Sequence, residues 1–177
     1  SAGLANSQPG LENQDDAYSD AIDIPFIFSF FGNCYNQLLV GTNGMLSFNL
    51  NQAGGFNPWI VQPLPFNDLN YNNAIFAVHQ DYYPWGTPGE FTWETFGAAP
   101  NRTFVASFNN LPAYSGCTSE GSTFQAVIYE TTNVIEIYIQ TKCDRSATVG
   151  LQSADGLTAY TAPGRNGTVW STTDEAW

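Results

Sequence analysis

Residues 123–130 read TFQAVIYE and residues 133–140 read NVIEIYIQ, with the dipeptide Thr131-Thr132 between them. Both runs are rich in β-branched and aromatic residues, which favour extended strands. Pairing across the dipeptide brings residue 123 opposite about residue 140. This stretch predicts an antiparallel hairpin, and it decides the fold class.

Similar strand-like runs recur on both sides of this hairpin, separated by turn residues. Thr42-Asn43-Gly44 is one such turn, because an Asn-Gly pair adopts positive φ at little cost. No stretch keeps the apolar spacing of a helix. We therefore predict an all-β, single-domain fold, an antiparallel β-sandwich or jelly roll, with a long ordered loop at about 51–73. The further strands are expected at 22–31, 37–41, 45–49, 74–79, 90–96, 103–109, 147–152 and 168–171.

Composition excludes several classes of protein. The chain has 177 residues, of which 43% are apolar and 15% aromatic, so it builds a core and is not disordered. Four Lys and Arg against sixteen Asp and Glu give a net charge of −12. We therefore expect no binding to nucleic acid or to an anionic membrane surface. The uncharged span 24–67 is interrupted by Asn, Gln, Gly and Pro, so we also expect no membrane insertion.

The first residues differ from the rest. Residues 1–21 are polar and acidic, and we interpret them as an N-terminal arm, with the β domain at 22–177. The chain starts with small residues and shows neither a basic region nor an apolar segment typical of a signal peptide. We interpret it as a mature, secreted protein of the cell surface.

Three cysteines leave one without a partner in any disulfide scheme. Cys117 and Cys143 flank the strongest hairpin and lie together at its open end, so we predict a disulfide between them. Cys34 is then a buried free thiol, or it is bonded to another chain.

Seven segments of the chain follow one another in a recognisable order and spacing. They are VGTNGMLSF (40–48), AIFAVHQD (74–81), RTFVASF (102–108), TFQAVIYE (123–130), VGLQ (149–152), PGRN (163–166) and EAW (175–177). Together they resemble the nidogen-like (NIDO) extracellular domain, in the form found in secreted surface proteins of gliding bacteria. The resemblance spans roughly residues 22–177, and it implies an all-β extracellular module that acts in adhesion or matrix assembly, without family-wide catalytic residues.

Few residues suggest chemistry. His79 is the sole histidine, and without a nucleophile elbow we interpret it as a hydrogen-bonded structural residue and expect no enzyme. Four acids close together could hold Ca²⁺ as a structural ion, but no D-x-D-x-D-G loop is present, so the simpler interpretation is a solvated acidic arm. These weak calcium candidates are Asp15, Asp16, Asp20 and Asp23. We expect no other metal or cofactor.

Aromatic residues in the loops are the candidate binding residues. Trp59, Tyr82, Tyr83 and Trp85 could stack on sugar rings or fill a pocket of a partner protein. The alternative is that these residues, together with Tyr71, pack under the long loop. Two sequons, at Asn101 and Asn166, could accept glycans.

These observations predict a secreted structural or adhesive surface protein. We expect it to associate with itself, forming a filament or an extracellular layer through its β-sandwich and its N-terminal arm. The alternative is a module that binds an extracellular glycan or protein through its loop aromatics.

Overall fold

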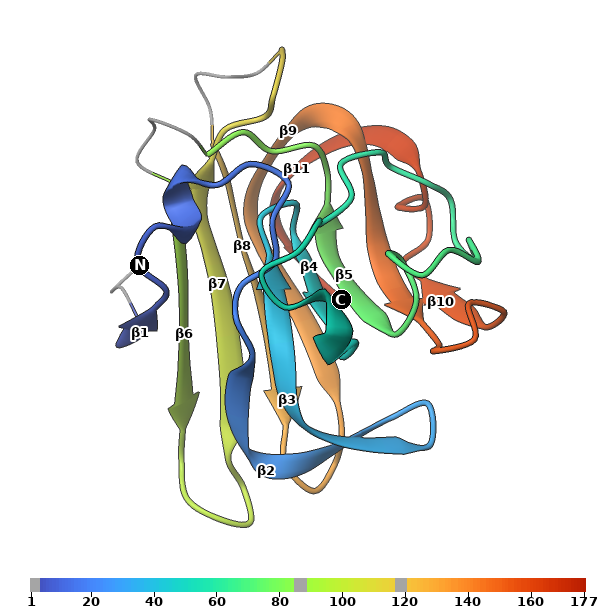
Figure 1. The fold of residues 1–177 in the computed structure, drawn as a ribbon. Helices are drawn as coiled ribbons and strands as arrows, with labels where there is room; N and C mark the ends of the chain where they lie inside the picture. Colours follow the sequence, from blue (N-terminus) through green and yellow to red (C-terminus); the bar gives the residue numbers. More distant parts are fainter. Residues whose placement is uncertain (1–3, 85–88, 117–120) are drawn as a thin grey trace.

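The computed structural model describes residues 4–84, 89–116 and 121–177 (Figure 1). Its strands form one antiparallel sheet in the order β1-β6-β7-β8-β9-β5-β4-β3-β2, and β10 and β11 also pair with β9. The strands are β1 (Asn6–Ser7), β2 (Ile22–Phe30), β3 (Asn33–Gly41), β4 (Met45–Ser47), β5 (Ala74–His79), β6 (Glu90–Phe96), β7 (Thr103–Leu111), β8 (Ser122–Tyr129), β9 (Ile135–Gln152), β10 (Ala159–Thr161) and β11 (Thr168–Ala176).

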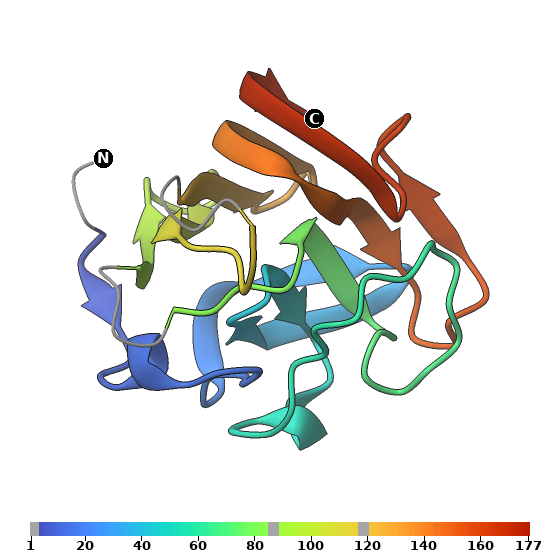
Figure 2. The same cartoon turned by 90° about the horizontal axis from the view of Figure 1, so that it is seen from above.

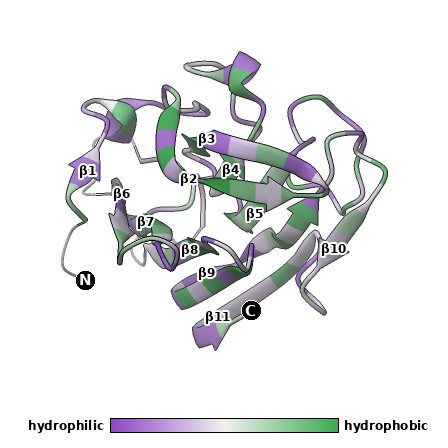
Figure 3. Cartoon of the chain, turned by 90° about the horizontal axis from the view of Figure 1, so that it is seen from below, coloured by the Kyte–Doolittle hydropathy of each residue, from purple (hydrophilic) through white to green (hydrophobic). Residues whose placement is uncertain are grey.

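The sheet curls strongly on itself into a half-barrel, so that β2–β5 face the layer of β6–β9 and β11 (Figures 2 and 3). The all-β, single-domain prediction is confirmed. The described residues contain no α-helix, only the short 3-10 helices η1 (Leu11–Asn13) and η2 (Leu50–Gln52). No helix in the described part of the chain has the length and apolar character needed to cross a membrane.

Strand β9 joins the two layers. Its first half pairs with β8, with Thr123 opposite Thr141, one residue from the predicted register. Its second half pairs with β5. The sequence predicted separate strands here at 133–140 and 147–152, and this was wrong. The polar run between them stays extended because β11 pairs with it, for example Thr172 with Lys142.

Two apolar clusters fill the fold. In β2 every second residue is buried, which is the alternation of a strand with one face in the core. These residues form the main core with side chains of β7, β8 and β9. A smaller cluster lies on the other side of β4 and β5, where the long loop covers it, and it includes Met45, Leu64, Tyr71 and Phe76. The loop is therefore ordered by packing, as predicted.

The turn between β3 and β4 requires glycine. Gly44 has a φ of +76°, and a Cβ there would lie 2.2 Å from the carbonyl oxygen of Val78. The neighbouring Asn43 is fully buried, and its Oδ1 accepts a hydrogen bond of 2.9 Å from the amide of Tyr82. This turn fixes where the chain leaves β5.

The N-terminal segment, expected as an arm, lies against the body along its described residues. β1 pairs with β6, and Leu11 is part of the main core. Tyr18 is fully buried in the smaller cluster, and its amide donates to the carbonyl of Gly55. Residues 4–20 thus contribute to the fold and do not project from it.

Candidate functional site

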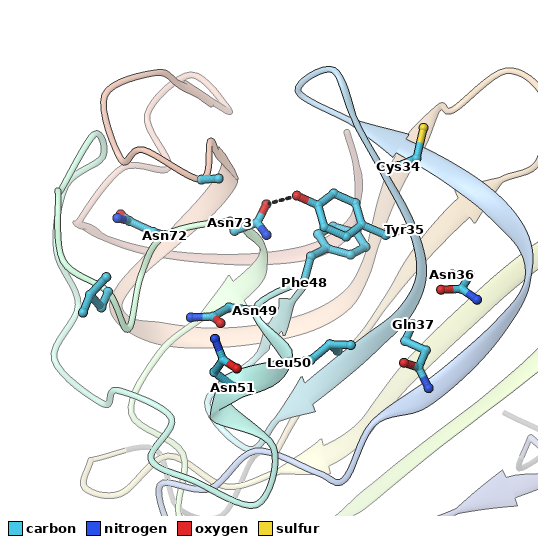
Figure 4. Close-up of a pocket in the computed structure, with 12 residues that line it drawn as sticks. Cys34, Tyr35, Asn36, Gln37, Phe48, Asn49, Leu50, Asn51, Asn72 and Asn73 are labelled. Atoms are coloured by element: carbon cyan, nitrogen blue, oxygen red, sulfur yellow. Dashed lines mark hydrogen bonds between the residues drawn. The ribbon is translucent and has the colours of Figure 1, made fainter.

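An open cleft of about 640 Å³ lies beside the start of β3, the residues after β4 and the end of the long loop (Figure 4). We call it the amide cleft, because half of its lining residues are Asn or Gln and none is charged. The lining residues are Cys34, Tyr35, Asn36, Gln37, Phe48, Asn49, Leu50, Asn51, Leu69, Asn72, Asn73 and Ala154.

A tyrosine and an asparagine hold the cleft in shape. The hydroxyl of Tyr35 donates a 3.1 Å hydrogen bond to Oδ1 of Asn73. The Tyr35 ring stacks on Phe48, with centroids 4.7 Å apart and 27° between the planes. Asn73 adopts a φ of +59°, and its backbone bonds to both Phe48 and Ser153. The ring of Tyr35 is half-buried, so part of its surface remains in the cleft.

Three asparagines present amides to the cleft. Asn36 and Asn51 are exposed, and Asn49 is half-buried. Asn49 occupies the N-cap position of η2, where an asparagine side chain commonly accepts a backbone hydrogen bond, yet it makes no such bond. Figure 4 shows Asn49 and Asn51 close together, with Asn36 on the other side of the cleft. An amide both donates and accepts, so these groups can bind hydroxyls of a ligand.

Apolar side chains lie beside these amides. Leu50 is 38% exposed and Leu69 is 77% exposed, although both are large and apolar. Uncharged hydrogen-bonding groups therefore alternate with apolar surface in the amide cleft. This combination suits a ligand that carries hydroxyls on an apolar ring.

The free thiol of Cys34 lies in the lining of the amide cleft and is exposed. The prediction of a buried thiol was wrong, because Cys34 lies in the exposed first part of β3, before the buried run that starts at Leu38. Cys143 is buried on β9. Its predicted disulfide partner, Cys117, lies outside the described residues, so that bond stays a prediction.

The loop aromatics differ in exposure. Trp59 is 45% exposed and Tyr83 is 37% exposed, which fits their predicted role in binding. Tyr82, predicted with them, is instead fully buried, where it stacks on Phe124 in the main core. The bridge between Tyr82 and Ala113 holds this side chain inward. Trp85 lies outside the described residues.

Two further hollows meet at Trp59, and we call them together the Trp59 surface. The smaller, of about 260 Å³, is lined by Trp59, Asp81, Asp15, Asp16 and Tyr114. The larger, of about 440 Å³, shares Trp59 and Asp81 and adds Gln80, Asp144 and Arg145 among its lining residues. Burial, together with Asp16 and Asp15, raises the pKa of Asp81 to about 6.

His79 positions this surface. It is fully buried, and its Nε2 lies 2.9 Å from the carbonyl oxygen of Pro58, the residue before Trp59. A carbonyl only accepts, so Nε2 carries the proton. Burial lowers the pKa of His79 to about 4, which keeps the ring neutral. The bond ties the long loop to β5.

The four calcium candidates do not come together. Asp16 accepts a hydrogen bond from Asn43, while Asp23 accepts one from Gln37 on β3. Asp15 lies with Asp16 at the Trp59 surface, and Asp20 is exposed elsewhere. Within the described ranges, no group of three or more His, Cys, Asp or Glu is arranged to hold a metal.

The two sequons differ. Asn101 is exposed in the turn between β6 and β7. The amide of Asn166 makes two hydrogen bonds, of 2.7 and 2.9 Å, to the backbone of Leu64. A glycan on Asn166 would disturb these bonds, so Asn101 is the better acceptor.

A family model described as NIDO related matches residues 4–176, nearly the whole chain. The chain belongs to the NIDO-related family. Membership of this family confirms the resemblance to the NIDO domain and suggests an extracellular domain; the bacterial variant stays a prediction. Searches of curated proteins and of solved structures gave no match.

The NIDO-related domain contains site residues that the sequence did not indicate. Asn36, Asn49 and Asn51 lie far from Asn73 along the chain, and the pairing of β3, β4 and β5 brings them to one cleft. The abundance of asparagine in the long loop was the one available signal.

Proposed function

We propose that this chain is an adhesive domain of the cell exterior that binds uncharged glycans in the amide cleft. The observation that carries the proposal is the absence of charge among the lining residues, in a chain with a net charge of −12. The NIDO-related family and the resemblance to bacterial surface proteins support a place outside the cell. The histidine of the chain, His79, is fully buried and bonded to Pro58, so its ring does not reach a bound ligand. This arrangement fits a protein that binds its ligand.

The chemistry of the amide cleft favours one class of ligand. An acidic polysaccharide would meet the field of an acidic protein and no cation in the cleft. A purely apolar ligand would cover the amides of Asn49 and Asn51 and leave them without hydrogen bonds, which costs free energy. A neutral sugar offers hydroxyls to these amides and an apolar ring face to Leu50 and Leu69. An open cleft binds one sugar weakly, so adhesion would come from many copies on a surface.

A glycan array with neutral and acidic oligosaccharides tests this proposal. We expect binding to neutral members, and about tenfold weaker binding when Asn49 and Asn51 are both replaced by Ala. The matched control is Asn101→Ala, which removes an exposed asparagine that does not line the amide cleft. Binding to acidic members alone, or equal losses in the control, would contradict the proposal.

Self-association is a second candidate, favoured by an apolar groove of about 230 Å³ beside β9 and β10. Tyr160 and Trp177 line this groove and are 66% and 42% exposed. None of its lining residues is charged, so two acidic copies could meet there with little repulsion. The sheet edges favour strand addition less, because Pro25 interrupts β2 and Asp174, at a φ of +56°, interrupts β11.

Light scattering over a concentration series tests self-association. We expect a dimer or filament that is lost in Tyr160→Ser and kept in Phe96→Ser. This result would support the apolar groove as the surface of self-association. Phe96 is a suitable control because it is also exposed, at 44%, and lies on β6. A monomer at every concentration would exclude this candidate.

A further inference from the structure

We infer that the Trp59 surface binds an arginine or lysine side chain from a basic segment of a partner protein. Its smaller hollow is lined by two aromatic rings, Trp59 and Tyr114, and three carboxylates. The rings are 45% and 60% exposed. An aromatic face and a carboxylate both attract a cation, and a long flexible stem can bring that cation between them.

The backbone holds these groups in place. The amide of Tyr114 donates a 3.0 Å hydrogen bond to the carbonyl of Asp81. The bond from His79 to Pro58 fixes the residue before Trp59. Asn43 donates to one carboxylate oxygen of Asp16 at 2.8 Å, which orients that side chain. The hollow is therefore formed before any ligand arrives.

The carboxylates of the Trp59 surface lack an adequate cation of their own. Arg145 is the nearest, and it lowers the pKa of Asp81 less than burial and the two neighbouring acids raise it. The other three cations are committed elsewhere. Arg102 pairs with Glu130 and Arg165 with Glu175, while Lys142 donates to three backbone carbonyls. A cation from a partner would relieve the repulsion between the three acids.

Gln80 points independently to a ligand. This residue is 1% exposed, and neither its amide nitrogen nor its amide oxygen has a hydrogen-bond partner among the described residues. It lines the larger hollow, beside Trp59 and Asp81. Buried amides in native proteins are nearly always paired, so the unpaired amide of a residue that lines the hollow indicates an absent partner. A rotation of the enclosed Gln80 side chain toward the hollow would let its oxygen accept from a guanidinium or ammonium group.

A second copy of this chain does not supply the cation. Three of its four cations are held as described above, and Arg145 lies at the same acidic surface. Two copies meeting there would bring eight carboxylates together, because the two hollows contain Asp15, Asp16, Asp81 and Asp144 in each copy. The partner is therefore a different protein with an exposed basic segment. The Trp59 surface shares no residue with the amide cleft, so this inference and the glycan proposal succeed or fail separately.

Fluorescence anisotropy with short labelled peptides tests the inference. One peptide alternates Gly and Arg, a second alternates Gly and Lys, and a third carries citrulline in place of Arg. We expect the basic peptides to bind and the citrulline peptide, which has the same shape without the charge, to bind at least about tenfold more weakly. Equal binding of the Arg and citrulline peptides would overturn the inference.

Substitutions locate the site. Asp81→Asn should weaken binding of the Arg peptide about tenfold. Asp174→Asn, the control, removes the same charge at an exposed position, and Asn tolerates its φ of +56° equally well. Trp59→Ala should weaken binding about fivefold, against no change for Tyr160→Ala. Equal losses in Asp81→Asn and Asp174→Asn would show diffuse attraction to an acidic protein and would also overturn the inference.

Binding should also depend on pH. Protonation of Asp81 near pH 6 removes one of the three negative charges of the smaller hollow, the others being Asp15 and Asp16. Asp144 and Arg145 are the charged groups that share the larger hollow with Asp81. We expect weaker binding of the Arg peptide at pH 5 than at pH 7.5, and a smaller difference in Asp81→Asn. Melting curves of each variant at both pH values verify that the fold is intact. A pH dependence that is unchanged in Asp81→Asn would count against this residue as a ligand.

Discussion

Two buried glutamines mark two different regions of the molecule. Gln152, at the end of β9, is fully buried and makes four hydrogen bonds. It bonds to both backbone groups of Phe66, to the carbonyl of Tyr71 and to the side chain of Asn72, and so holds the long loop against the sheet. Gln80, just after β5, is equally buried, and its amide has no partner among the described residues.

This difference separates residues that stabilise the fold from residues that are available for binding. A paired buried amide contributes to stability, whereas an unpaired one lowers it. The same contrast holds for charge. Lys142 is buried but donates to three carbonyls, while the acids of the Trp59 surface repel one another.

The largest expected effect is at Gln152. Replacing it with Leu should lower the free energy of unfolding by about 3 kcal/mol, because four hydrogen bonds are lost and their partners stay buried. Urea denaturation measures this change. Gln125→Leu is the control, since Gln125 is half-exposed and makes one side-chain bond, to Ser107, and should cost less than about 1 kcal/mol. Equal costs would remove the distinction between the two regions.

Lys142→Met should come next, with a loss of about 2 kcal/mol. Methionine keeps the apolar stem, but the carbonyls of Cys143, Arg145 and Trp170 lose their donor, and the contact with the Trp170 ring at 4.3 Å is lost. Thermal and urea unfolding both measure this loss of stability. Arg145→Met, at the half-exposed neighbouring cation, should change stability by less than about 0.5 kcal/mol.

Gln80→Leu should have the opposite sign. Leucine has a similar size and removes an unpaired amide, so we expect a gain of about 1 kcal/mol in unfolding free energy. The same variant should bind the Arg peptide more weakly. A loss of stability would mean that the amide of Gln80 is satisfied in solution, and the contrast with Gln152 would fail.

The smallest effect is the pH dependence at Asp81. Its pKa is raised from 3.8 to about 6, so the folded state binds the proton more tightly than the unfolded state, and this group lowers stability as pH rises from about 4 to 6. Asp81→Asn should therefore gain about 0.5 kcal/mol at pH 7 and nothing at pH 4.

His79 acts in the opposite direction, because its pKa is lowered to about 4 and its contribution is lost as pH falls from 6.5 to 4. The parent protein and the Asp81→Asn variant both contain His79. Its contribution to stability therefore cancels when the urea midpoints of the two proteins are compared at each pH. A gain that does not change with pH would show that Asp81 has an ordinary pKa.

The strands were predictable wherever apolar and polar residues alternate. β5 and β6 have the predicted bounds, and β8 and β9 pair within one residue of the predicted register. The continuous strand β9 was not predictable, because its charged middle looks like a loop until β11 pairs with it. Short β1 and β10 carry too few residues for a pattern.

The sites were less predictable than the strands. Trp59 and Tyr83 were predicted as binding residues because large aromatics in a loop are conspicuous; both are exposed, and their role in binding stays a prediction. Neighbouring residues of an extended chain point to opposite sides, and sequence could not assign Tyr82 to the core. The amide cleft depends on three segments that only the sheet brings together.

The arrangement of β9 has a consequence for how the protein is made. Because β9 is common to both layers, neither layer can close over the core until residues 135–152 have left the ribosome. The hairpin of β6 and β7 and the turn at Gly44 can form earlier from local contacts, but their apolar faces stay uncovered. If translation pauses before β9 is complete, the unfinished chain would therefore expose apolar surface to chaperones and proteases for as long as the pause lasts.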